Sequence, residues 1–287
     1  MSELRASPQE WPLGSVIDGQ YRLERRLGRG GMGVVFRAHD ITLDRSVAIK
    51  ALDVERCGED ELVRFRKEAR ALASVRHDNV CQIYAFGTHA GMAYFAMELV
   101  AGRDLDSLVQ EHAAFGEVMP APAALAVVRG IGRGLSAVHA RGVVHRDVKP
   151  SNVIVETGTL RPVLIDFGLA QRPSTSNPRI SLVGGTPSYM APEQAMDAKG
   201  NGAGPHADIY AFACSVFEIL TGRPPFEANT TYEVLVKHLK EPPPRISERR
   251  PELARLDDVL LRAMAKKPDE RPPTCDAFVA EVEAALG

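Results

Sequence analysis

Residues that suit phosphoryl transfer gather in one short segment of the chain. Residues 145–152 contain a carboxylate, an amine and an amide in the order Asp147, Lys149 and Asn152. Another carboxylate, Asp166, follows after a short strand-like run. A carboxylate in such a loop can accept a proton, and the oxygen atoms of Asn152 and Asp166 suit a divalent cation. A base and two metal ligands rarely meet in one window by accident, so the segment indicates chemistry on phosphate groups.

A glycine-rich element near the N-terminus could approach phosphate groups. Its pattern is G-x-G-x-x-G, formed by Gly28, Gly30 and Gly33. Without Cβ atoms, backbone amides at these positions can come close to phosphate oxygens. Taken alone, the pattern fits a flexible hairpin equally well. A dinucleotide-binding fold would need a helix after the glycines, whereas a strand-like run follows here, so we favour a glycine flap over a nucleotide.

A lysine downstream of the glycines is placed to meet phosphate groups. In the strand-like residues 47–50, the period of two puts Ala48 and Lys50 on one face, opposite to the other two apolar residues. An ammonium on that face could bind the α- and β-phosphates of a nucleotide. Its counter-charge is predicted to be Glu68, at the edge of the apolar stripe of the next helix, with Glu61 as the second choice.

A second run of glycines, at Gly130, Gly132 and Gly134, resembles a nucleotide loop only superficially. It lies inside a predicted helix, where each glycine should weaken the helix by about 1 kcal/mol relative to Ala. Close packing of this helix against a neighbour is the better explanation.

The composition bounds the class of protein. With 287 residues and 45% hydrophobic content, the chain can bury a large core in one or two domains. Its 35 basic and 37 acidic residues nearly cancel, which argues against nucleic acid or an anionic membrane surface as a partner. Local basic clusters are expected to be solvated strand faces, for example Arg22, Arg25, Arg26 and Arg29.

Cysteine usage and hydropathy indicate a soluble, cytoplasmic chain. The four cysteines lack C-x-x-C spacing, so neither a zinc site nor a disulfide framework is predicted. Residues 1–14 are polar and do not resemble a signal peptide. The most apolar run, residues 212–220, contains Glu218 and falls short of the roughly 18 residues that span a bilayer. The alternative that the chain is the cytosolic domain of a longer, membrane-anchored protein remains open.

Hydrophobic periodicity predicts an α+β protein with a small β-rich lobe and a larger, mostly helical lobe. The first hundred residues have strand-like runs and one helix with an apolar stripe, at residues 21–27, 34–38, 46–51, 59–75, 80–86 and 92–99. Helical patterns then dominate, at residues 104–112, 122–140, 206–220, 231–240, 252–265 and 274–286. The segment between Asp166 and Glu193 has no periodicity and is rich in Ser, Thr, Pro and Gly, which is typical of a functional loop.

Together these motifs resemble the signature set of protein kinases in order and spacing. The set comprises the glycine loop, V-A-I-K, a helix Glu, H-R-D-x-K-P-x-N, D-F-G and A-P-E. The resemblance extends over residues 21–286 and is strongest to bacterial eukaryotic-like (Hanks-type) Ser/Thr kinases, in which G-G-M-G-x-V and Y-M-A-P-E-Q are typical. It implies a bilobal kinase fold with an extension at residues 1–20, an N-lobe at 21–99, a hinge at 98–103 and a C-lobe at 104–287.

The resemblance implies a role for each matching residue. Asp147 would accept or orient the substrate hydroxyl proton, and Lys149 would lie near the γ-phosphate. Asn152 and Asp166 would hold Mg²⁺, or Mn²⁺ in its place, between the phosphates of ATP, and the Lys50–Glu68 pair would complete the catalytic set. The implied ATP-binding residues are Leu27, Gly28, Gly30, Gly33, Val35, Ala48, Lys50, Met97, Glu98, Val100, Asp104 and Ile154.

Within that set, Met97 is the implied gatekeeper, the backbones of Glu98 and Val100 would bind adenine, and Asp104 would reach the ribose. The base would lie between the side chains of Val35, Ala48 and Ile154. The resemblance also implies a stack of four residues that links the lobes, namely Leu72, Ile83, His145 and Phe167.

Three further roles are implied by the same match. Glu193 should form a buried pair with Arg271, and Asp208 should brace the catalytic loop. Arg146 before the catalytic Asp suggests control by phosphorylation of the activation loop. The positions at which bacterial relatives carry Thr hold Pro178 and Ile180 here, so the predicted phosphate acceptors are Ser181 and the cluster Ser174, Thr175 and Ser176.

The implied function is that of a Ser/Thr protein kinase, because Lys149 and Thr186 match Ser/Thr rather than Tyr kinases. Its partners would be proteins with Ser or Thr hydroxyls, including its own activation loop, and a homodimer would allow phosphorylation between copies. The alternative from another class is a pseudokinase, a nucleotide-binding scaffold, although Lys50, Asp147, Asn152 and Asp166 are all present. Small-molecule kinases such as antibiotic or choline kinases usually lack the A-P-E segment.

Overall fold

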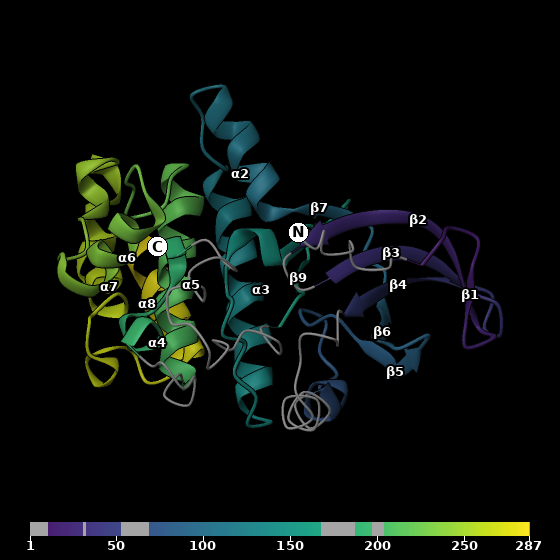
Figure 1. Cartoon of the computed structure of the whole chain (residues 1–287). Helices are drawn as coiled ribbons and strands as arrows, with labels where there is room; N and C mark the ends of the chain where they lie inside the picture. Colours follow the sequence, from purple (N-terminus) through teal and green to yellow (C-terminus); the bar gives the residue numbers. More distant parts are fainter. Residues whose placement is uncertain (1–10, 31–32, 53–68, 168–186, 197–203, 287) are drawn as a thin grey trace, which may run out of the picture. The chain divides into compact units, whose positions relative to one another are not determined.

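The computed structural model describes residues 11–30, 33–52, 69–167, 187–196 and 204–286 (Figure 1). These residues divide into two units. The first takes the described residues of Met1–Ser74 and Gln82–Leu99, and the second takes those of Val75–Cys81 and Val100–Gly287. The first is built on one sheet, whereas the second is mostly helical, as the hydrophobic periodicity predicts.

The sheet of the first unit is antiparallel, with the strand order β1-β2-β3-β4-β6-β5. Its strands are β1 (Val16–Ile17), β2 (Tyr21–Gly30), β3 (Gly33–Asp40), β4 (Arg45–Leu52), β5 (Ile83–His89) and β6 (Met92–Glu98). The predicted strand at residues 80–86 starts too early, because residues up to Cys81 belong to the second unit. Of the predicted helix at 59–75, residues 69–73 are helical and 59–68 lie outside the described residues.

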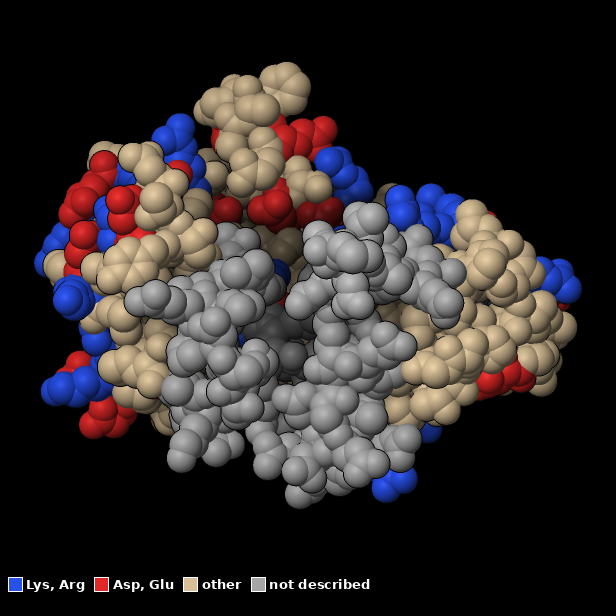
Figure 2. Space-filling view, viewed as in Figure 1, with Lys and Arg blue, Asp and Glu red and all other residues tan. Residues whose placement is uncertain are grey.

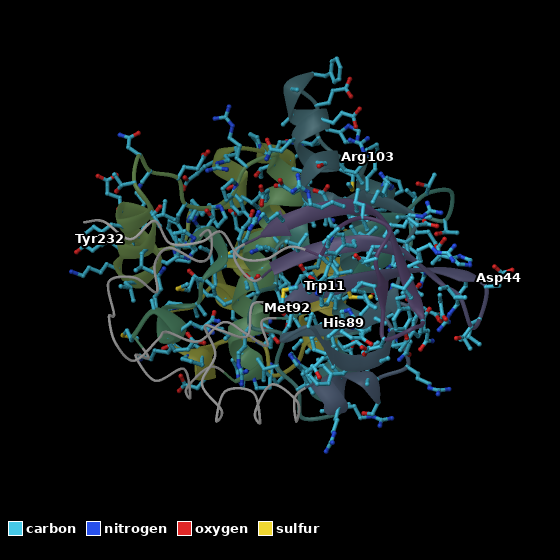
Figure 3. The ribbon with its side chains drawn as sticks, turned by 45° about the vertical axis from the view of Figure 1, so that its right-hand side comes forward. Trp11, Asp44, His89, Met92, Arg103 and Tyr232 are labelled. Atoms are coloured by element: carbon cyan, nitrogen blue, oxygen red, sulfur yellow. The ribbon has the colours of Figure 1, made fainter. Side chains whose placement is uncertain are left out.

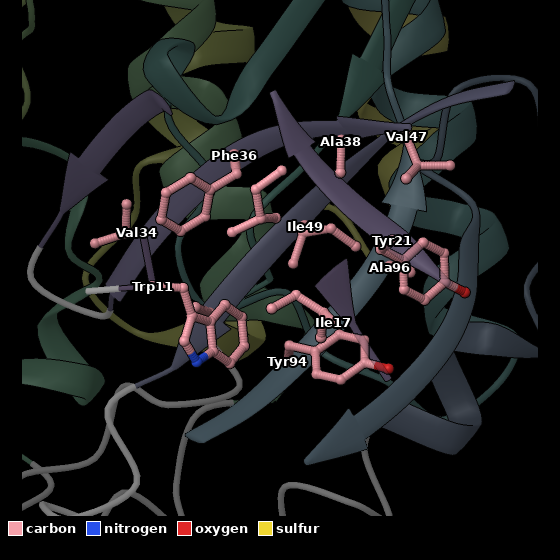
Figure 4. Packing of buried hydrophobic residues seen from close by; sticks show 12 residues of the cluster. Trp11, Ile17, Tyr21, Val34, Phe36, Ala38, Val47, Ile49, Tyr94 and Ala96 are labelled. Atoms are coloured by element: carbon pink, nitrogen blue, oxygen red, sulfur yellow. The ribbon is translucent and has the colours of Figure 1, made fainter. Parts of the chain in front are cut away.

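One face of this sheet carries the core of the first unit (Figure 4). Alternation along β3 and β4 directs every second side chain to this face, so that Phe36 and Ile49 are buried there. Rings from other strands complete the core, including Tyr21 and Tyr94. The opposite face of β3 and β4 is thereby left for the residues that alternate with them.

The segment before β2 is part of this core, which the sequence did not predict. Trp11 is 7% exposed and packs edge-on against the ring of His89 at 5.6 Å (Figure 3) and against the ring of Tyr94 at 6.1 Å (Figure 4). The Tyr94 hydroxyl donates to Asp18 Oδ2 at 2.7 Å, and burial together with this carboxylate raises the pKa of Tyr94. Residues 11–20 are therefore integral to the first unit.

The second unit consists of helices and a small sheet. Its elements are β7 (Gly102–Asp104), α2 (Leu105–Ala114), α3 (Ala121–His139), β8 (Val153–Glu156), β9 (Pro162–Leu164), α4 (Pro192–Met196), α5 (Pro205–Thr221), α6 (Thr231–Lys240), α7 (Asp257–Ala263) and α8 (Cys275–Leu286). The predicted helix at 252–265 begins instead as a 3-10 helix, Pro251–Leu256, because Leu253 leaves helical geometry (φ −97°, ψ 15°). Helix α5 is buried on nearly all sides and forms the centre of this unit.

The glycines of α3 allow close approach by three neighbours. A Cβ atom at Gly130 would collide with Pro162, and one at Gly132 would collide with Val279 of α8. At Gly134 it would lie 2.8 Å from the Asn79 backbone oxygen. The predicted packing role of these glycines is confirmed, and it explains why the helix tolerates them.

The segment Val75–Cys81 is attached to β9 by backbone hydrogen bonds. Cys81 N donates to Leu164 O at 2.9 Å, and Leu164 N donates to Asn79 O at 2.9 Å. The Asn79 side chain also donates to Pro162 O at 2.7 Å. These contacts explain why the segment belongs to the helical unit although the residues on both sides of it in sequence belong to the first unit.

Acidic and basic side chains are interspersed on the face of the helical unit that Figure 2 shows. Some join elements, as in the ion pairs Arg129–Glu283 and Arg262–Glu281, which attach α8 to α3 and α7. Exposed pairs of this kind contribute at most about 1 kcal/mol each. Among the helices that the structure describes, none has both the length and the hydropathy needed to cross a membrane.

Candidate active site

The backbone ahead of Asp147 is held in an unusual conformation by a buried carboxylate. Arg146 has φ +65°, in the left-handed region that non-glycine residues rarely adopt. Asp208, 1% exposed in the first turn of α5, accepts hydrogen bonds from the N–H groups of His145 at 2.8 Å and Arg146 at 2.7 Å. His139 Nε2 lies 2.7 Å from the same carboxylate. The predicted brace from Asp208 to this loop therefore forms.

The Asp147 carboxylate is held by two side chains of its own loop. Lys149 Nζ lies 3.1 Å from Oδ1 and 2.9 Å from Oδ2. Asn152 Nδ2 donates to Oδ2 and to the Asp147 backbone oxygen, both at 2.8 Å. The Asp147 and Lys149 side chains are only 18% and 17% exposed. This arrangement gives the carboxylate a defined direction, as a proton acceptor requires.

Asn152 and Asp166 fit the expected cation. The Asn152 Nδ2 group donates to Asp147, which leaves Oδ1 as the atom that could bind a cation. Within the described part of the chain, Oδ1 accepts no hydrogen bond. The Asn152 backbone oxygen accepts from Ile165 N at 2.9 Å, which ties it to the residue before Asp166. An amide oxygen and a carboxylate are hard oxygen ligands of the kind that Mg²⁺ and Mn²⁺ prefer, with phosphate and water completing the shell.

His145 is a buried structural residue. Its Nε2 lies 3.2 Å from the Ile165 carbonyl, and its Nδ1 lies 3.3 Å from Asp147 N. A carbonyl only accepts and a backbone N–H only donates, so these partners specify a neutral ring with the proton on Nε2. Burial lowers the pKa of His145, although the carboxylates of Asp208 and Asp147 oppose this shift. The ring stacks on Phe167 at 4.3 Å, the predicted contact within the second unit.

In the first unit, the sheet face opposite the core carries the predicted nucleotide contacts. Val35 is directly opposite Lys50 across β3 and β4, and Ala48 is directly opposite Met97 across β4 and β6. The prediction that Ala48 and Lys50 share one face is confirmed, because the core takes the residues between them. Lys50 is 8% exposed. The four side chains form one continuous patch on the sheet.

The predicted glycine loop lies at the β2–β3 connection. Gly28 and Gly30 end β2, while Gly33 opens β3 with φ +140° and is directly opposite Gly30. Leu27 is 39% exposed beside them. A strand therefore follows the glycines, as expected, and not the helix of a dinucleotide-binding fold.

Two of the residues predicted to contact adenine and ribose have hydrogen-bond partners of their own. Glu98 N donates to Gln82 O at 2.9 Å, so this N–H already has a backbone partner. In the second unit, Asp104 is directly opposite Ile154 across β7 and β8, and Val100 precedes them. The Asp104 carboxylate caps α2 by accepting from Ser107 N at 2.8 Å.

The predicted buried pair of Glu193 and Arg271 forms. Arg271 donates from Nη1 to Oε1 at 2.7 Å and from Nη2 to Oε2 at 2.8 Å, a bidentate arrangement. Its remaining donors reach the backbone oxygens of His206 and Ala265, both at 2.8 Å, and of Lys266, at 3.3 Å. The Arg271 side chain is fully buried. The pair anchors α4 to the segment before α8.

Comparison with known proteins agrees with this geometry. The protein kinase domain family matches residues 21–281. The chain belongs to the protein kinase family. Over 288 residues this kinase domain is 35% identical to the serine/threonine-protein kinase pkn3 of Myxococcus xanthus, covering 95% of the chain and 51% of that relative. Over 274 residues it is 39% identical to the serine/threonine-protein kinase PknE of Mycobacterium tuberculosis, covering 93% and 46%.

Solved structures give the same family. The crystal structure of the Mycobacterium tuberculosis PknI kinase domain superimposes with a TM-score of 0.78 at 30% identity, covering 96% of this chain and all of that one. A point mutant of the PknI kinase domain gives a TM-score of 0.79. The bilobal kinase fold is therefore confirmed. The chain spans about half the length of the curated relatives, which are named as kinases and do not support the scaffold alternative.

Several predicted residues of this kinase domain lie outside the described residues. They are the lysine partner Glu68, its alternative Glu61, and the activation-segment residues Ser174, Thr175, Ser176, Ser181 and Thr186. Their roles stay predictions.

The structure also shows contacts of residues to which the sequence analysis assigned no role. Gln194, directly after A-P-E, donates from Nε2 to the Arg146 backbone oxygen at 3.0 Å. Tyr189 donates from its hydroxyl to Glu218 Oε2 at 2.6 Å. The sequence signals were a polar residue next to an anchoring motif and a Glu inside an apolar helix, but their partners are far away in sequence.

Proposed function

We propose that this chain transfers the γ-phosphate of ATP to Ser and Thr hydroxyls of proteins. The observation that carries this proposal is the Asp147 carboxylate, held on both oxygens by Lys149 and on one by Asn152. Phosphoryl transfer needs little covalent chemistry from the protein, so positioning and charge stabilisation supply most of the rate. A carboxylate with a defined direction and an adjacent ammonium supplies both.

In the proposed reaction, Asp147 accepts the proton of the substrate hydroxyl as its oxygen attacks the γ-phosphorus. Lys149 donates to the transferred phosphate and stabilises its charge. Asn152 and Asp166 would hold Mg²⁺, or Mn²⁺ in its place, and the ion would neutralise negative charge on the phosphates. His145 takes no part in proton transfer, because both ring nitrogens already have backbone partners.

The nucleotide would use residues from both units. In the first, Val35 and Ala48 offer apolar contact to the base and Lys50 its charge to the α- and β-phosphates, with Glu68 as the proposed partner of Lys50. In the second, Ile154 and Val100 offer contacts to the base. The further proposed ATP contacts are Leu27, Gly28, Gly30, Gly33, Met97, Glu98 and Asp104.

Asp104 could reach a ribose only while sharing its carboxylate with the cap of α2. Substitution by Asn, which caps helices equally well, would therefore keep α2 and weaken only the ribose contact. An unchanged KM for ATP in Asp104→Asn would argue against this contact.

The acceptor specificity rests on the type of the relatives and on Lys149 and Thr186. We propose that the chain also phosphorylates its own activation segment, at Ser181 or among Ser174, Thr175 and Ser176. A homodimer would allow transfer between copies, in which case the initial rate of self-phosphorylation rises with the square of the protein concentration. The proposed location is the cytoplasm, as a cytosolic domain if the parent protein is membrane-anchored.

The test compares the chain with Asp147→Asn in the presence of Mg²⁺ and γ-labelled ATP. Asp44→Asn is a matched control, because the Asp44 side chain is 93% exposed at the β3–β4 turn. We expect label on Ser or Thr with the unmodified chain and the control, and loss of at least about a hundredfold in Asp147→Asn. ATP binding without transfer in the unmodified chain would favour the scaffold alternative.

A further inference from the structure

Gln194 makes one hydrogen bond to a residue near it in sequence and one to a residue far from it. Its Oε1 accepts from Ala191 N at 3.0 Å, three residues back at the start of α4. This is half of a capping box, in which a Gln or Glu in the first turn satisfies the N–H that precedes the helix. Its Nε2 donates to the Arg146 backbone oxygen at 3.0 Å, 48 residues away in the catalytic loop. The local bond stabilises α4, whereas the distant bond connects α4 to the loop.

The two partners fix the orientation of the Gln194 amide. A backbone N–H can only donate and a backbone carbonyl can only accept, so Oε1 faces Ala191 and Nε2 faces Arg146. The helix that carries this amide is itself anchored, since the adjacent Glu193 forms the bidentate pair with buried Arg271. The amide therefore transmits the position of an anchored helix to the catalytic loop.

The bond from Gln194 falls on the peptide unit that leads into the proposed base. The Arg146 oxygen belongs to the peptide bond between Arg146 and Asp147, and the N–H of that same peptide lies 3.3 Å from His145 Nδ1. Both polar atoms of this planar unit are thus held. Arg146 has φ +65°, a conformation that the backbone of a non-glycine residue does not prefer by itself. Contacts from outside the loop must therefore hold the peptide in this orientation.

We propose that Gln194 is a positioning residue that orients the Asp147 carboxylate through the Arg146–Asp147 peptide. Asp208 holds the peptide unit before Arg146 and Gln194 holds the one after it. The inference rests on the proposed function, because it concerns the rate of phosphoryl transfer. It assigns to the residue after A-P-E the task of coupling the anchored end of the activation segment to the catalytic loop.

Gln194→Glu separates the two hydrogen bonds. Glu at this position still accepts from Ala191 N and caps α4 equally well, but it presents an oxygen to the Arg146 oxygen in place of a donor. We expect kcat with Mg²⁺, ATP and dephosphorylated casein to fall about ten- to a hundredfold, the effect of a displacement near 1 Å. The KM for ATP should stay within about twofold, because no nucleotide contact changes.

The control is Gln110→Glu, which makes the same charge change at an exposed site on α2. This control should leave kcat unchanged, although it loses the hydrogen bond between Gln110 and Asp106. Urea denaturation should show that Gln194→Glu remains folded under the conditions of the kinetic assay. A wild-type kcat in Gln194→Glu would overturn the inference. If this variant does not fold, Gln194→Met takes its place, and a wild-type kcat in the folded Met variant would overturn the inference likewise. An unmodified chain without transfer would instead refute the proposed function.

Discussion

The carboxylate of Asp208 accepts a hydrogen bond from the backbone N–H of Arg146 at 2.7 Å, across 62 residues of sequence. It stabilises a backbone conformation that costs a non-glycine residue about 1–2 kcal/mol by itself. The fold thus stabilises a strained residue directly before Asp147, and the conformation of this residue helps to set the direction of the Asp147 carboxylate.

Replacing Asp208 by Asn should reduce both stability and activity. The amide keeps one acceptor but brings a donor toward backbone N–H groups of His145 and Arg146 that are already donors. We expect a loss of about 3 kcal/mol in the free energy of unfolding, measured by urea denaturation, because buried donors lose their partner. Asp276→Asn on α8 makes the same change elsewhere, and equal losses in both variants would contradict the prediction.

Gly134→Ala should destabilise the chain although Ala is the better helix former. The new Cβ would lie 2.8 Å from the Asn79 backbone oxygen, which is held by its bond from Leu164 N and cannot easily move. We expect a loss of about 1–3 kcal/mol from overpacking, against a gain of about 1 kcal/mol in helix propensity. Arg133→Ala, on the exposed face next to it, should change stability by less than about 0.5 kcal/mol.

Ionisation of Glu218 should lower the free energy of unfolding as the pH rises to about 7. Burial raises the pKa of Glu218 from its ordinary 4.5 to about 7, although the hydrogen bond from Tyr189 opposes this. The folded state then binds the proton more tightly than the unfolded chain. Its contribution is fully present below about pH 4.5 and is lost as the pH rises through about 7, a change of about 3 kcal/mol.

The measurement is the free energy of unfolding of the unmodified chain and of Glu218→Gln between pH 5 and 8. Gln mimics the protonated acid, so the stability advantage of the variant should increase with pH. The pKa of buried His238 is lowered to about 4, which by itself makes stability rise between about pH 4 and 6.5. Because His238 is present in both proteins, its contribution cancels when the free energy of unfolding of one protein is subtracted from that of the other. Exposed Glu233→Gln is the matched control for the charge change. A difference between the unmodified chain and Glu218→Gln that does not depend on pH would refute the prediction.

Trp11→Ala should destabilise the first unit although Trp11 precedes the residues matched by the kinase family. The indole is 7% exposed between His89 and Tyr94, so its removal leaves a cavity in the core. We expect a loss of about 3 kcal/mol or more in the free energy of unfolding. Leu13→Ala is the control, since Leu13 is 58% exposed and should tolerate the change. A Trp11 variant as stable as this control would show that the segment is not part of the core.

The contacts within the Asp147 loop and the faces of the sheet in the first unit could be predicted from sequence, because both depend on short spacings. The loop bonds among Asp147, Lys149 and Asn152 span at most five residues. The period of two in β4 placed Ala48 and Lys50 on one face, and the register with β3 and β6 agrees. Residue type and local geometry carry this information without tertiary structure.

Sequence patterns of this kind could not predict contacts between residues far apart in sequence, unless the resemblance to a family implied them. Trp11 gave no periodic signal, and the strand expected from Val80 starts at Ile83 because the preceding residues bind β9. The glycines of α3 predicted close packing, but only the structure names Pro162, Val279 and Asn79 as the neighbours.

By itself, then, the sequence determined which groups meet within one loop or along one strand, because a few residues of backbone geometry settle those distances. Only the tertiary structure decided that Gln194 holds the peptide after Arg146 from 48 residues away, whereas the brace by Asp208, 62 residues away, was implied by the family resemblance. A side chain shows what it can donate or accept, but its partner depends on where the packed helices α4 and α5 bring it.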